Sequence, residues 1–279
     1  MRRSMVYLAG GAALALLAGV ASVGGMAERL MSDGFTQGFR QNDRQSDVDA
    51  FAAGAPRQAA QAIADGDDTA LKAVLSASPE VASSFAGDID LLILAMAHRN
   101  RNAFEALMEA GASPDGAGKY APIAYSIEMT DDWWLDRLIA LRADPDGTAP
   151  NGMEALDRAI LEQTEDRALK LVAAGADPKL DTGGGNTYAH EAAIVNRFNV
   201  VEALMEKGAD MWATSGIGVT PAYLVTNPSR ATTGNPEVLE PARQRLLARL
   251  KETGPEWPPS SPEEVRDRVK AGTWLRPVN

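Results

Sequence analysis

The sequence predicts an all-α solenoid of about five to six helix-turn-helix units with short hairpin loops, preceded by an N-terminal hydrophobic helix. Three observations lead to this prediction. A motif of small and apolar residues recurs at a nearly constant interval between residues 57 and 254. Each recurrence contains two apolar stretches of helical length. Residues 5–27 contain no charged residue and are rich in Ala, Leu, Gly and Val.

The first 27 residues are predicted to be a signal peptide or a signal anchor. Arg2 and Arg3 precede the apolar segment, and Glu28 ends it. Small residues before Ala21 and Ala27 would suit cleavage, while the uncharged segment is also long enough to span a bilayer. In both cases the arginines stay on the cytoplasmic side. We therefore expect a periplasmic protein, exported or anchored in the inner membrane by residues 5–27.

Residues 28–56 are polar and mixed, and we predict a linker there. The chain has no cysteine, which excludes disulfides, thiolate metal sites and cysteine nucleophiles. Its net charge of −11 without a basic run argues against nucleic-acid binding, which needs clustered Lys and Arg. An acidic protein instead favours a protein partner with a basic surface.

The repeat is clearest from one alanine that recurs in four aligned segments. These segments open at Asp90, Ala121, Glu154 and Thr187, and in each the alanine lies at the same distance from the opening residue. A fifth segment opens at Thr220, one further repeat along the chain, and a degenerate leading unit spans Gln58 to Ser83. The four alanines are Ala112, Ala143, Ala176 and Ala209.

The residues around these positions resemble the ankyrin repeat, which has a period of about 33 residues. Thr220-Pro221 matches the first half of its opening motif, and Thr187 with His190 matches the two ends. The closing motif is matched by Gly175-Ala176-Asp177 and Gly208-Ala209-Asp210. The resemblance covers residues 57–254, and it implies a non-catalytic protein that binds another protein, as a monomeric array.

The second unit departs from this pattern in two ways. Arg142 stands where the other units have the glycine that ends the second helix, so a left-handed conformation would cost energy there. The unit also contains Trp133 and Trp134. The register predicts that Trp134 is a core residue. It leaves open whether Trp133 is structural or contacts a partner.

The last unit contains an insertion between its two helices. If Leu250 matches Leu204, the two lie thirteen positions further apart than one repeat. The extra positions fall around 226–236, and such a loop is either functional or a tolerated surface insertion. Residues 255–279 follow as a C-terminal capping helix and tail. Ser261 with Glu264 predicts a capping box, and Pro262 fits the first helical position.

Few residues suggest catalysis or ligand chemistry. The resemblance implies that His190 ties its turn together by hydrogen bonds, and His98 is predicted to lie on the surface. Neither histidine has a metal-ligand partner at helical or hairpin spacing. Gly183-Gly184-Gly185 lacks the Lys-Ser/Thr of a phosphate loop and is predicted to lie in a hairpin. We expect no catalytic residue, cofactor or metal.

The resemblance implies binding through the hairpin tips and the concave face of the first helices. Tyr120 and Trp212 are the strongest candidates because Tyr and Trp are frequent interface anchors. Trp133 and Arg230, the latter in the inserted loop, extend the set. The candidate residues are Lys119, Tyr120, Trp133, Asp146, Lys179, Asp181, Met211, Trp212 and Arg230.

Four functions are compatible with these features. The leading hypothesis is a protein-binding scaffold of the cell envelope or periplasm. Narrower alternatives are an immunity or accessory protein that neutralises a secreted toxin, and a periplasmic ankyrin protein associated with oxidative-stress defence. The alternative from a different class is a hydrolase with its site in the 226–236 loop, which the shortage of nucleophile–base pairs disfavours.

Overall fold

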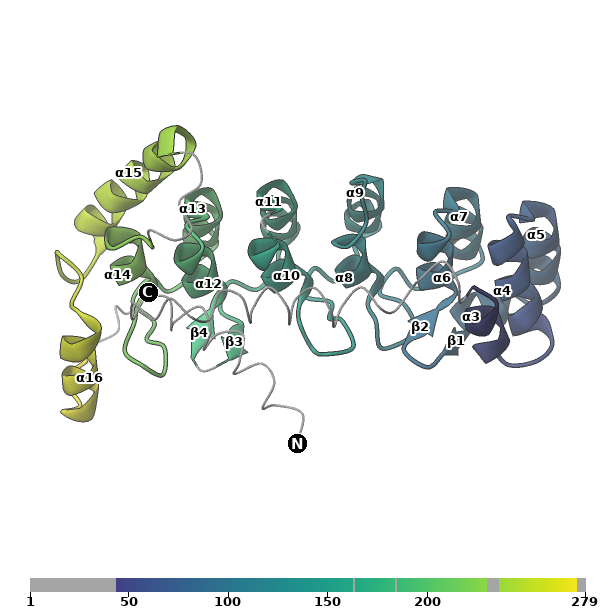
Figure 1. The fold of residues 1–279 in the computed structure, drawn as a ribbon, viewed down its shortest axis with the longest axis horizontal. Helices are drawn as coiled ribbons and strands as arrows, with labels where there is room; N and C mark the ends of the chain where they lie inside the picture. The colour runs from purple at the N-terminus through teal and green to yellow at the C-terminus, as the bar shows by residue number, and fades with distance from the viewer. Residues whose placement is uncertain (1–43, 163, 184, 230–235, 275–279) are drawn as a thin grey trace. The chain divides into compact units, whose positions relative to one another are not determined.

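The computed structural model describes residues 44–162, 164–183, 185–229 and 236–274. They form two compact units, which are described one at a time: an N-terminal unit up to Arg158 and a C-terminal unit from Ala159 onward. Both are mostly helical, as predicted, and each contains one short β-hairpin (Figure 1). The predicted N-terminal hydrophobic helix lies outside the described residues.

The N-terminal unit is a series of helix pairs. A short 3-10 turn at Pro79–Ser83 leads into the antiparallel hairpin β1 (Phe85–Ala86) and β2 (Ile89–Asp90). Its helices are α3 (Arg44–Ala50), α4 (Ala55–Asp65), α5 (Asp68–Ala77), α6 (Leu91–Ala97), α7 (Arg101–Glu109), α8 (Pro122–Ser126), α9 (Trp133–Ala140) and the start of α10 (Ala155–Leu161).

The C-terminal unit continues with the same kind of helix pair. The hairpin of β3 (Asp181–Gly183) and β4 (Asn186–Thr187) contains glycines of the predicted hairpin segment. Its helices after α10 are α11 (Glu165–Ala174), α12 (Tyr188–Ile194), α13 (Phe198–Glu206), α14 (Pro221–Thr226), α15 (Pro236–Thr253) and α16 (Pro262–Lys270).

The sequence period reappears as the spacing of helices. In the N-terminal unit, first helices α6 and α8 begin at Leu91 and Pro122; in the C-terminal unit, α12 and α14 begin at Tyr188 and Pro221. Both intervals are close to the ankyrin period of about 33 residues. The degenerate leading segment also forms a helix pair, α4 with α5. Successive pairs contact each other inside each unit, α5 with α7 and α11 with α13 for example.

First and second helices of a pair bury different amounts of surface. Leu91 to Met96, most of first helix α6, are almost completely inaccessible. Second helix α7 buries only one face, with Phe104 and Leu107 inside and Glu109 exposed. Trp134 of α9 is fully buried, which confirms its prediction as a core residue. The first helices therefore form the inner layer, and the second helices cover them on one side.

A buried carboxylate connects neighbouring pairs in the N-terminal unit. Asp90 caps α6 by accepting a hydrogen bond from the Ile93 N–H at 2.8 Å, and its other oxygen accepts one from the distant Ala117 N–H at 2.7 Å. Burial raises the pKa of Asp90, although backbone N–H donors at Ile93, Ala117, Gly118 and Leu92 oppose the shift. The side chain thus fixes the turn before α8 to the start of α6.

His190 makes the matching connection in the C-terminal unit. Its Nδ1 accepts a hydrogen bond from the Thr187 N–H at 3.0 Å, and its Nε2 lies 3.1 Å from the Val219 carbonyl oxygen. These contacts assign the proton of the neutral ring to Nε2. The histidine holds its own turn together, as the resemblance implied, and also fixes the turn before α14.

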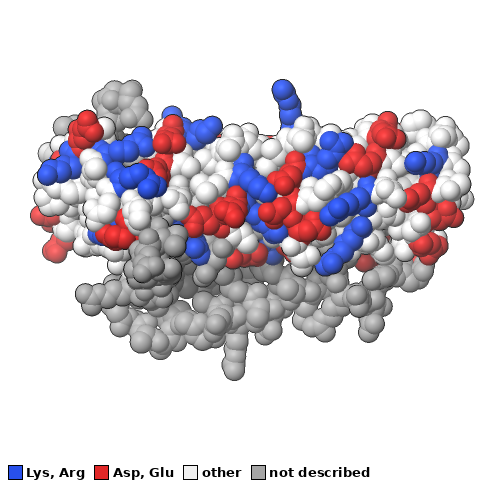
Figure 2. All heavy atoms as spheres, turned by 90° about the horizontal axis from the view of Figure 1, so that it is seen from above, with Lys and Arg blue, Asp and Glu red and all other residues white. Residues whose placement is uncertain are grey.

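Ion pairs and polar contacts join the outer surfaces of successive second helices. Arg137 of α9 donates two hydrogen bonds to the carboxylate of Glu105 in α7, each at 2.7 Å. Arg245 of α15 binds Glu202 of α13 in the C-terminal unit. Figure 2 shows acidic and basic side chains mixed over this face. Exposed pairs of this kind contribute about 0–1 kcal/mol each, so they set register more than stability.

Several second helices end on a left-handed residue. Gly111 has φ 97° and Gly175 has φ 109°, and neither has any atom within 4 Å of the place a Cβ would occupy. Arg142 adopts the same conformation with φ 61°, and the Ala143 N–H that follows it bonds the Leu138 carbonyl at 3.0 Å. Helix α9 therefore ends in the same left-handed conformation as α7 and α11. Arg142 has a side chain that makes this conformation strained, whereas glycine would adopt it without strain.

Two predicted boundaries are wrong. The linker expected at 28–56 includes α3, whose Val48 and the following Phe51 are buried; residues 28–43 lie outside the described part. The insertion in the last unit is only partly a loop. Helix α15 begins at Pro236, well before Leu250, whereas α13 begins at Phe198, only about two turns before the matching Leu204. Most of the inserted length therefore extends a helix.

The C-terminal helix forms as predicted, with Ser261 and Glu264 making a capping box. Its Val265 is fully buried, and Arg266 donates a hydrogen bond to the Ile217 carbonyl at 2.8 Å. A Cβ on Gly218 would lie 2.6 Å from the Pro262 carbonyl oxygen, so only glycine permits this approach. Helix α16 therefore rests on the turn that precedes α14.

We predict that Arg142→Gly stabilises the N-terminal unit by about 0.5–1 kcal/mol. Relief of the left-handed strain outweighs the greater entropy of glycine in the unfolded chain. The matched control is Gly111→Ala, which meets no neighbouring atom and should lose about 1 kcal/mol for the opposite reason. Urea unfolding measures both changes, and two shifts of the same sign would contradict the prediction.

His190 should make stability fall in mild acid. Burial lowers its pKa from 6.5 to about 4, against the opposing hydrogen bonds of Val219 and Ala213 and the charge of Asp181. Because the folded pKa lies below the unfolded one, this contribution is complete above about pH 6.5 and declines as the pH drops towards 4. By pH 4.5 the decline reaches about 2–3 kcal/mol.

The comparison with His190→Gln isolates this effect, since burial raises the pKa of Asp90 and Glu191 and their contribution changes with pH in the opposite direction. We expect the stability difference between wild type and variant to shrink from pH 7 to pH 4.5 in urea unfolding. A difference that stays constant across this range would show that folding does not shift the pKa of His190.

Candidate functional site

The charged residues predicted for the hairpin tips lie mostly at the surface. Lys119, Lys179 and Asp181 are exposed, and Asp146 is half-buried. Lys119 lies 3.6 Å from Asp88 in the preceding hairpin. Arg230 and residues 231–235 of the inserted loop lie outside the described residues. The charged tips can therefore contact solvent or a partner in both units.

Tyr120 does not project from its hairpin, contrary to the prediction. Its side chain is 9% exposed and its ring packs edge-on against Tyr125, with 5.3 Å between ring centroids. Its hydroxyl donates to Glu128 and accepts a hydrogen bond from Arg158 at 3.2 Å. The buried Arg158 also pairs with Glu128. The buried guanidinium of Arg158, which is distant in the sequence, thus holds the Tyr120 hydroxyl inside the unit.

Met211 and Trp212 are also buried rather than exposed, which corrects the second aromatic candidate. Trp212 is 4% exposed. A Cβ added to Gly254 would lie 2.4 Å from the indole, so the glycine after α15 leaves space for the ring. The Trp212 backbone N–H donates to the Asp210 side chain at 2.8 Å. The ring is part of the packing between this turn and the end of α15.

Trp133 is the predicted aromatic candidate that keeps part of its ring at the surface. The indole is half-buried and packs edge-on against Trp134, with centroids 4.7 Å apart, and against Phe104 at 6.0 Å. The Arg101 guanidinium lies 4.7 Å from the ring centroid and also pairs with Asp131. These contacts hold the ring in one orientation on the face of α7 and α9.

Two exposed apolar side chains, one in a hairpin strand and one in a turn, were not predicted. Phe85 is 59% exposed in β1, and Ile217 is 45% exposed in the turn before α14. Both backbones are held: Phe85 pairs with Asp90, and the Ile217 carbonyl accepts the hydrogen bond from Arg266. The helical period carries no information about turn residues, although the flanking Gly216 and Gly218 mark Ile217 as a tip.

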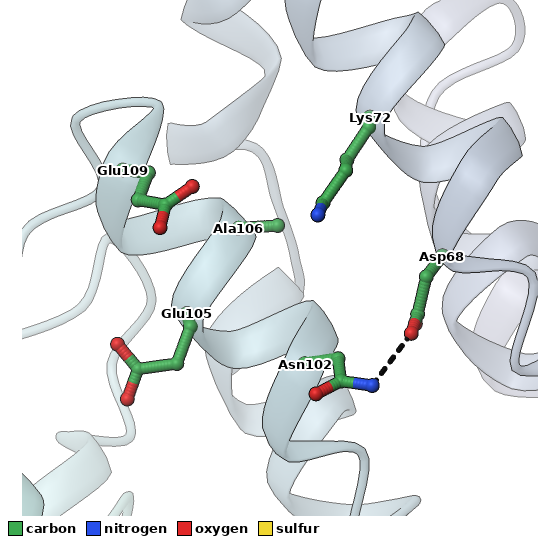
Figure 3. Close-up of a pocket in the computed structure, with 6 residues that line it drawn as sticks. All are labelled: Asp68, Lys72, Asn102, Glu105, Ala106 and Glu109. Atoms are coloured by element: carbon green, nitrogen blue, oxygen red, sulfur yellow. Dashed lines mark hydrogen bonds between the residues drawn. The ribbon is translucent and has the colours of Figure 1, made fainter.

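A shallow hollow of about 330 Å³ lies between second helices α5 and α7 of the N-terminal unit. Figure 3 shows Lys72 extending from α5 towards α7, and Asn102 donating to Asp68 at 2.7 Å. Glu105, on the same wall, is paired with Arg137. The hollow is open, and Asp68 and Glu105 already have partners, so its polar groups serve mainly to join helices. Its lining is Asp68, Lys72, Asn102, Glu105, Ala106 and Glu109.

A buried acid lies at the hairpin of the C-terminal unit. Glu191 of α12 accepts hydrogen bonds from Asn186 at 2.9 Å and Thr182 at 3.4 Å. Burial raises its pKa, and the two donors oppose that shift. Because all three residues belong to one hairpin and the helix that follows it, Glu191 braces this hairpin.

The remaining chemical expectations concern metals and membranes. No group of three or more His, Asp or Glu residues suited to a metal ion occurs among the described residues. His98 is half-buried at the end of α6. Within the same described ranges, no helix combines the length and the apolar character needed to cross a bilayer.

The structure thus has one exposed apolar side chain in a hairpin strand of the N-terminal unit, one in a turn of the C-terminal unit, and a half-buried tryptophan on the outer face of the N-terminal unit. No protein-family model matches the chain, and no curated protein sequence matches it. The function proposed below rests on the burial, contacts and charges of this chain.

Proposed function

We propose that the chain is an ankyrin-type solenoid that binds another protein through its hairpin turns and does not catalyse a reaction. The observation that carries the proposal is the exposure of Phe85 in hairpin strand β1 and of Ile217 in the turn before α14, one in each unit, where backbone hydrogen bonds hold both segments. Large apolar side chains held in place by backbone hydrogen bonds are suited to anchoring an interface, since little conformational entropy is lost on binding.

The ankyrin assignment is supported by what the matching residues do. His190 and Thr187 tie a turn together, and Gly175 supplies a left-handed helix end. Ala112 and Ala176 of the closing motifs are buried. The first helices begin close to one ankyrin period of about 33 residues apart. These are the roles that the opening and closing motifs have in the resemblance.

The charge of the chain indicates the chemistry of the partner. The net charge is −11, and Asp181 is exposed at a hairpin of the C-terminal unit. A partner with a basic patch beside an apolar pocket would associate faster through electrostatic steering and would then bury Phe85 or Ile217. Burying a side chain of this size contributes about 1.5–3 kcal/mol.

Delivery to the cell envelope is the second part of the proposal. It rests on Arg2 and Arg3 followed by the uncharged residues 5–27. The scaffold would then act in the periplasm, either released or held at the inner membrane.

A photo-crosslinking residue placed at 85 or 217 should form an adduct with the partner in envelope extracts. The matched control positions are Ala73 on α5 and Ala248 on α15, which are exposed on second helices of the same two units. We expect adducts of defined mass from the turns and none from the controls. Equal labelling at all four positions, or none at the turns, would reject the binding surface.

The delivery prediction is tested by replacing Arg2 and Arg3 with Glu in cells of a Gram-negative bacterium. Wild-type protein should be digested by protease added to spheroplasts, whereas the variant should be protected inside. Mass spectrometry of the accessible protein then distinguishes a cleaved peptide from an intact anchor. Wild-type protein that stays protected would exclude export.

A further inference from the structure

One turn of the N-terminal unit carries an asparagine directly before a glycine. Asn151 and Gly152 are both exposed, and Asn151 is the one asparagine of the chain that a glycine follows. The turn connects Thr148 and Glu154, which form an isolated antiparallel bridge just before α10. The Asn-Gly pair is therefore open to water on a turn whose base is held in place.

Glycine leaves the backbone nitrogen at position 152 accessible to the preceding side chain. Gly152 has φ 85°, and no atom lies within 4 Å of the place that a Cβ would occupy. A side chain at this position would crowd the approach of the Asn151 carboxamide to the nitrogen. The other described asparagines all precede a residue with a side chain, and Asn186 and Asn196 are also buried. Asn151 thus has the least hindered neighbouring nitrogen.

The side-chain oxygen of Asn151 already accepts a hydrogen bond that would stabilise negative charge on it. The Met153 N–H donates to Oδ1 at 3.1 Å. When a nucleophile adds to an amide carbon, charge develops on the amide oxygen, and a fixed N–H donor lowers the energy of that state. The turn therefore provides a carbon open to attack, a neighbouring nitrogen and a donor to the oxygen.

One contact opposes a reaction between these groups. The Gly152 N–H donates to the Ala149 carbonyl oxygen at 2.8 Å, and this bond must open before the nitrogen can lose its proton. Because Gly152 is exposed in a short turn, such an opening costs far less free energy than unfolding the unit. Asn151 can therefore react while the rest of the chain stays folded.

We propose that Asn151 is a site of spontaneous deamidation in the folded chain, with water as the co-reactant. Solvent base removes the proton from the Gly152 nitrogen, which then forms a bond to Cγ of Asn151. The bond between Cγ and Nδ2 breaks, and Nδ2 takes up a proton and leaves as ammonia. Water opens the resulting cyclic imide at either of its carbonyl carbons, which gives an aspartyl or an isoaspartyl residue. No oxidation or reduction is involved.

The two products differ in their effect on the turn. Both add a negative charge, but the isoaspartyl product also adds one carbon to the main chain. The longer backbone cannot keep both the bond from Gly152 to Ala149 and the bond from the Ala149 N–H to the Met153 carbonyl, now 2.9 Å. An aspartyl carboxylate can still accept the hydrogen bond from Met153. The isoaspartyl form should therefore loosen the turn before α10, and the aspartyl form should preserve it.

The experiment incubates the folded full-length protein in mildly alkaline buffer and locates new carboxylates by mass spectrometry of its peptides, while released ammonia is measured. We expect conversion at Asn151 before any other asparagine. Asn151→Gln should abolish the ammonia released from this site, because its longer side chain would have to close a larger ring. Gly152→Ala should slow conversion by crowding the nitrogen. Circular dichroism checks that both variants keep the helix content of wild type.

The same incubation in guanidinium chloride gives the unfolded reference. Conversion of Asn151 in the unfolded chain but not in the folded chain would show that the hydrogen bond to Ala149 protects the site, and would overturn the proposal. Earlier conversion of another asparagine in the folded chain, or equal rates in wild type and Gly152→Ala, would also overturn it. The inference goes beyond the proposed partner binding and does not depend on it, since no partner is present in the experiment.

Discussion

Helix pairs as short as α6 and α7 cannot bury their own apolar surface, and the rest of the structure depends on this constraint. Each pair must pack against a neighbour, so α5 contacts α7 and α11 contacts α13. First helices such as α6 and α12 become almost wholly buried inner elements, while the second helices need only one apolar face. Stability is thus gained between pairs rather than within them.

Packing between apolar surfaces is not directional, so register has to come from polar contacts. At the start of a first helix, the Asp90 carboxylate fixes the register in one unit and the His190 imidazole fixes it in the other. Both join a helix start to the next turn along the chain. Burying such groups is costly unless every polar atom is satisfied. The four backbone donors to Asp90 and the two ring contacts of His190 meet that requirement.

The same constraint explains which large side chains remain exposed. Polar side chains of the second helices pair with the neighbouring helix, as Glu105 does with Arg137. Tyr120 and Trp212 are drawn into the packing between turns and helices. Side chains of the hairpins and turns need not pack in the interior to hold these segments in place, because the backbones are already hydrogen-bonded. Phe85 in strand β1 and Ile217 in the turn before α14 can therefore be exposed without loss of order.

Local and periodic features were predictable from the sequence. The repeat spacing and the apolar stretches predicted the helix pairs, Ser261 with Glu264 predicted a capped helix, and Trp134 was placed in the core by its register. Arg142 was predicted to be strained because its neighbours at the matching position are glycines. Each of these depends on interactions within one turn of chain or on repetition, both of which are visible in a single sequence.

The sequence alone could not place the side chains whose partners come from distant segments. Tyr120 is buried because the distant Arg158 binds its hydroxyl, and Trp212 because Gly254 leaves space for its ring. Two apolar residues in a polar stretch were too few to mark α3, and the insertion could not be divided between loop and helix. The sequence by itself determined the repeat and its helices. Only the tertiary structure decided which aromatic rings face solvent, because burial depends on which segments the packing brings together.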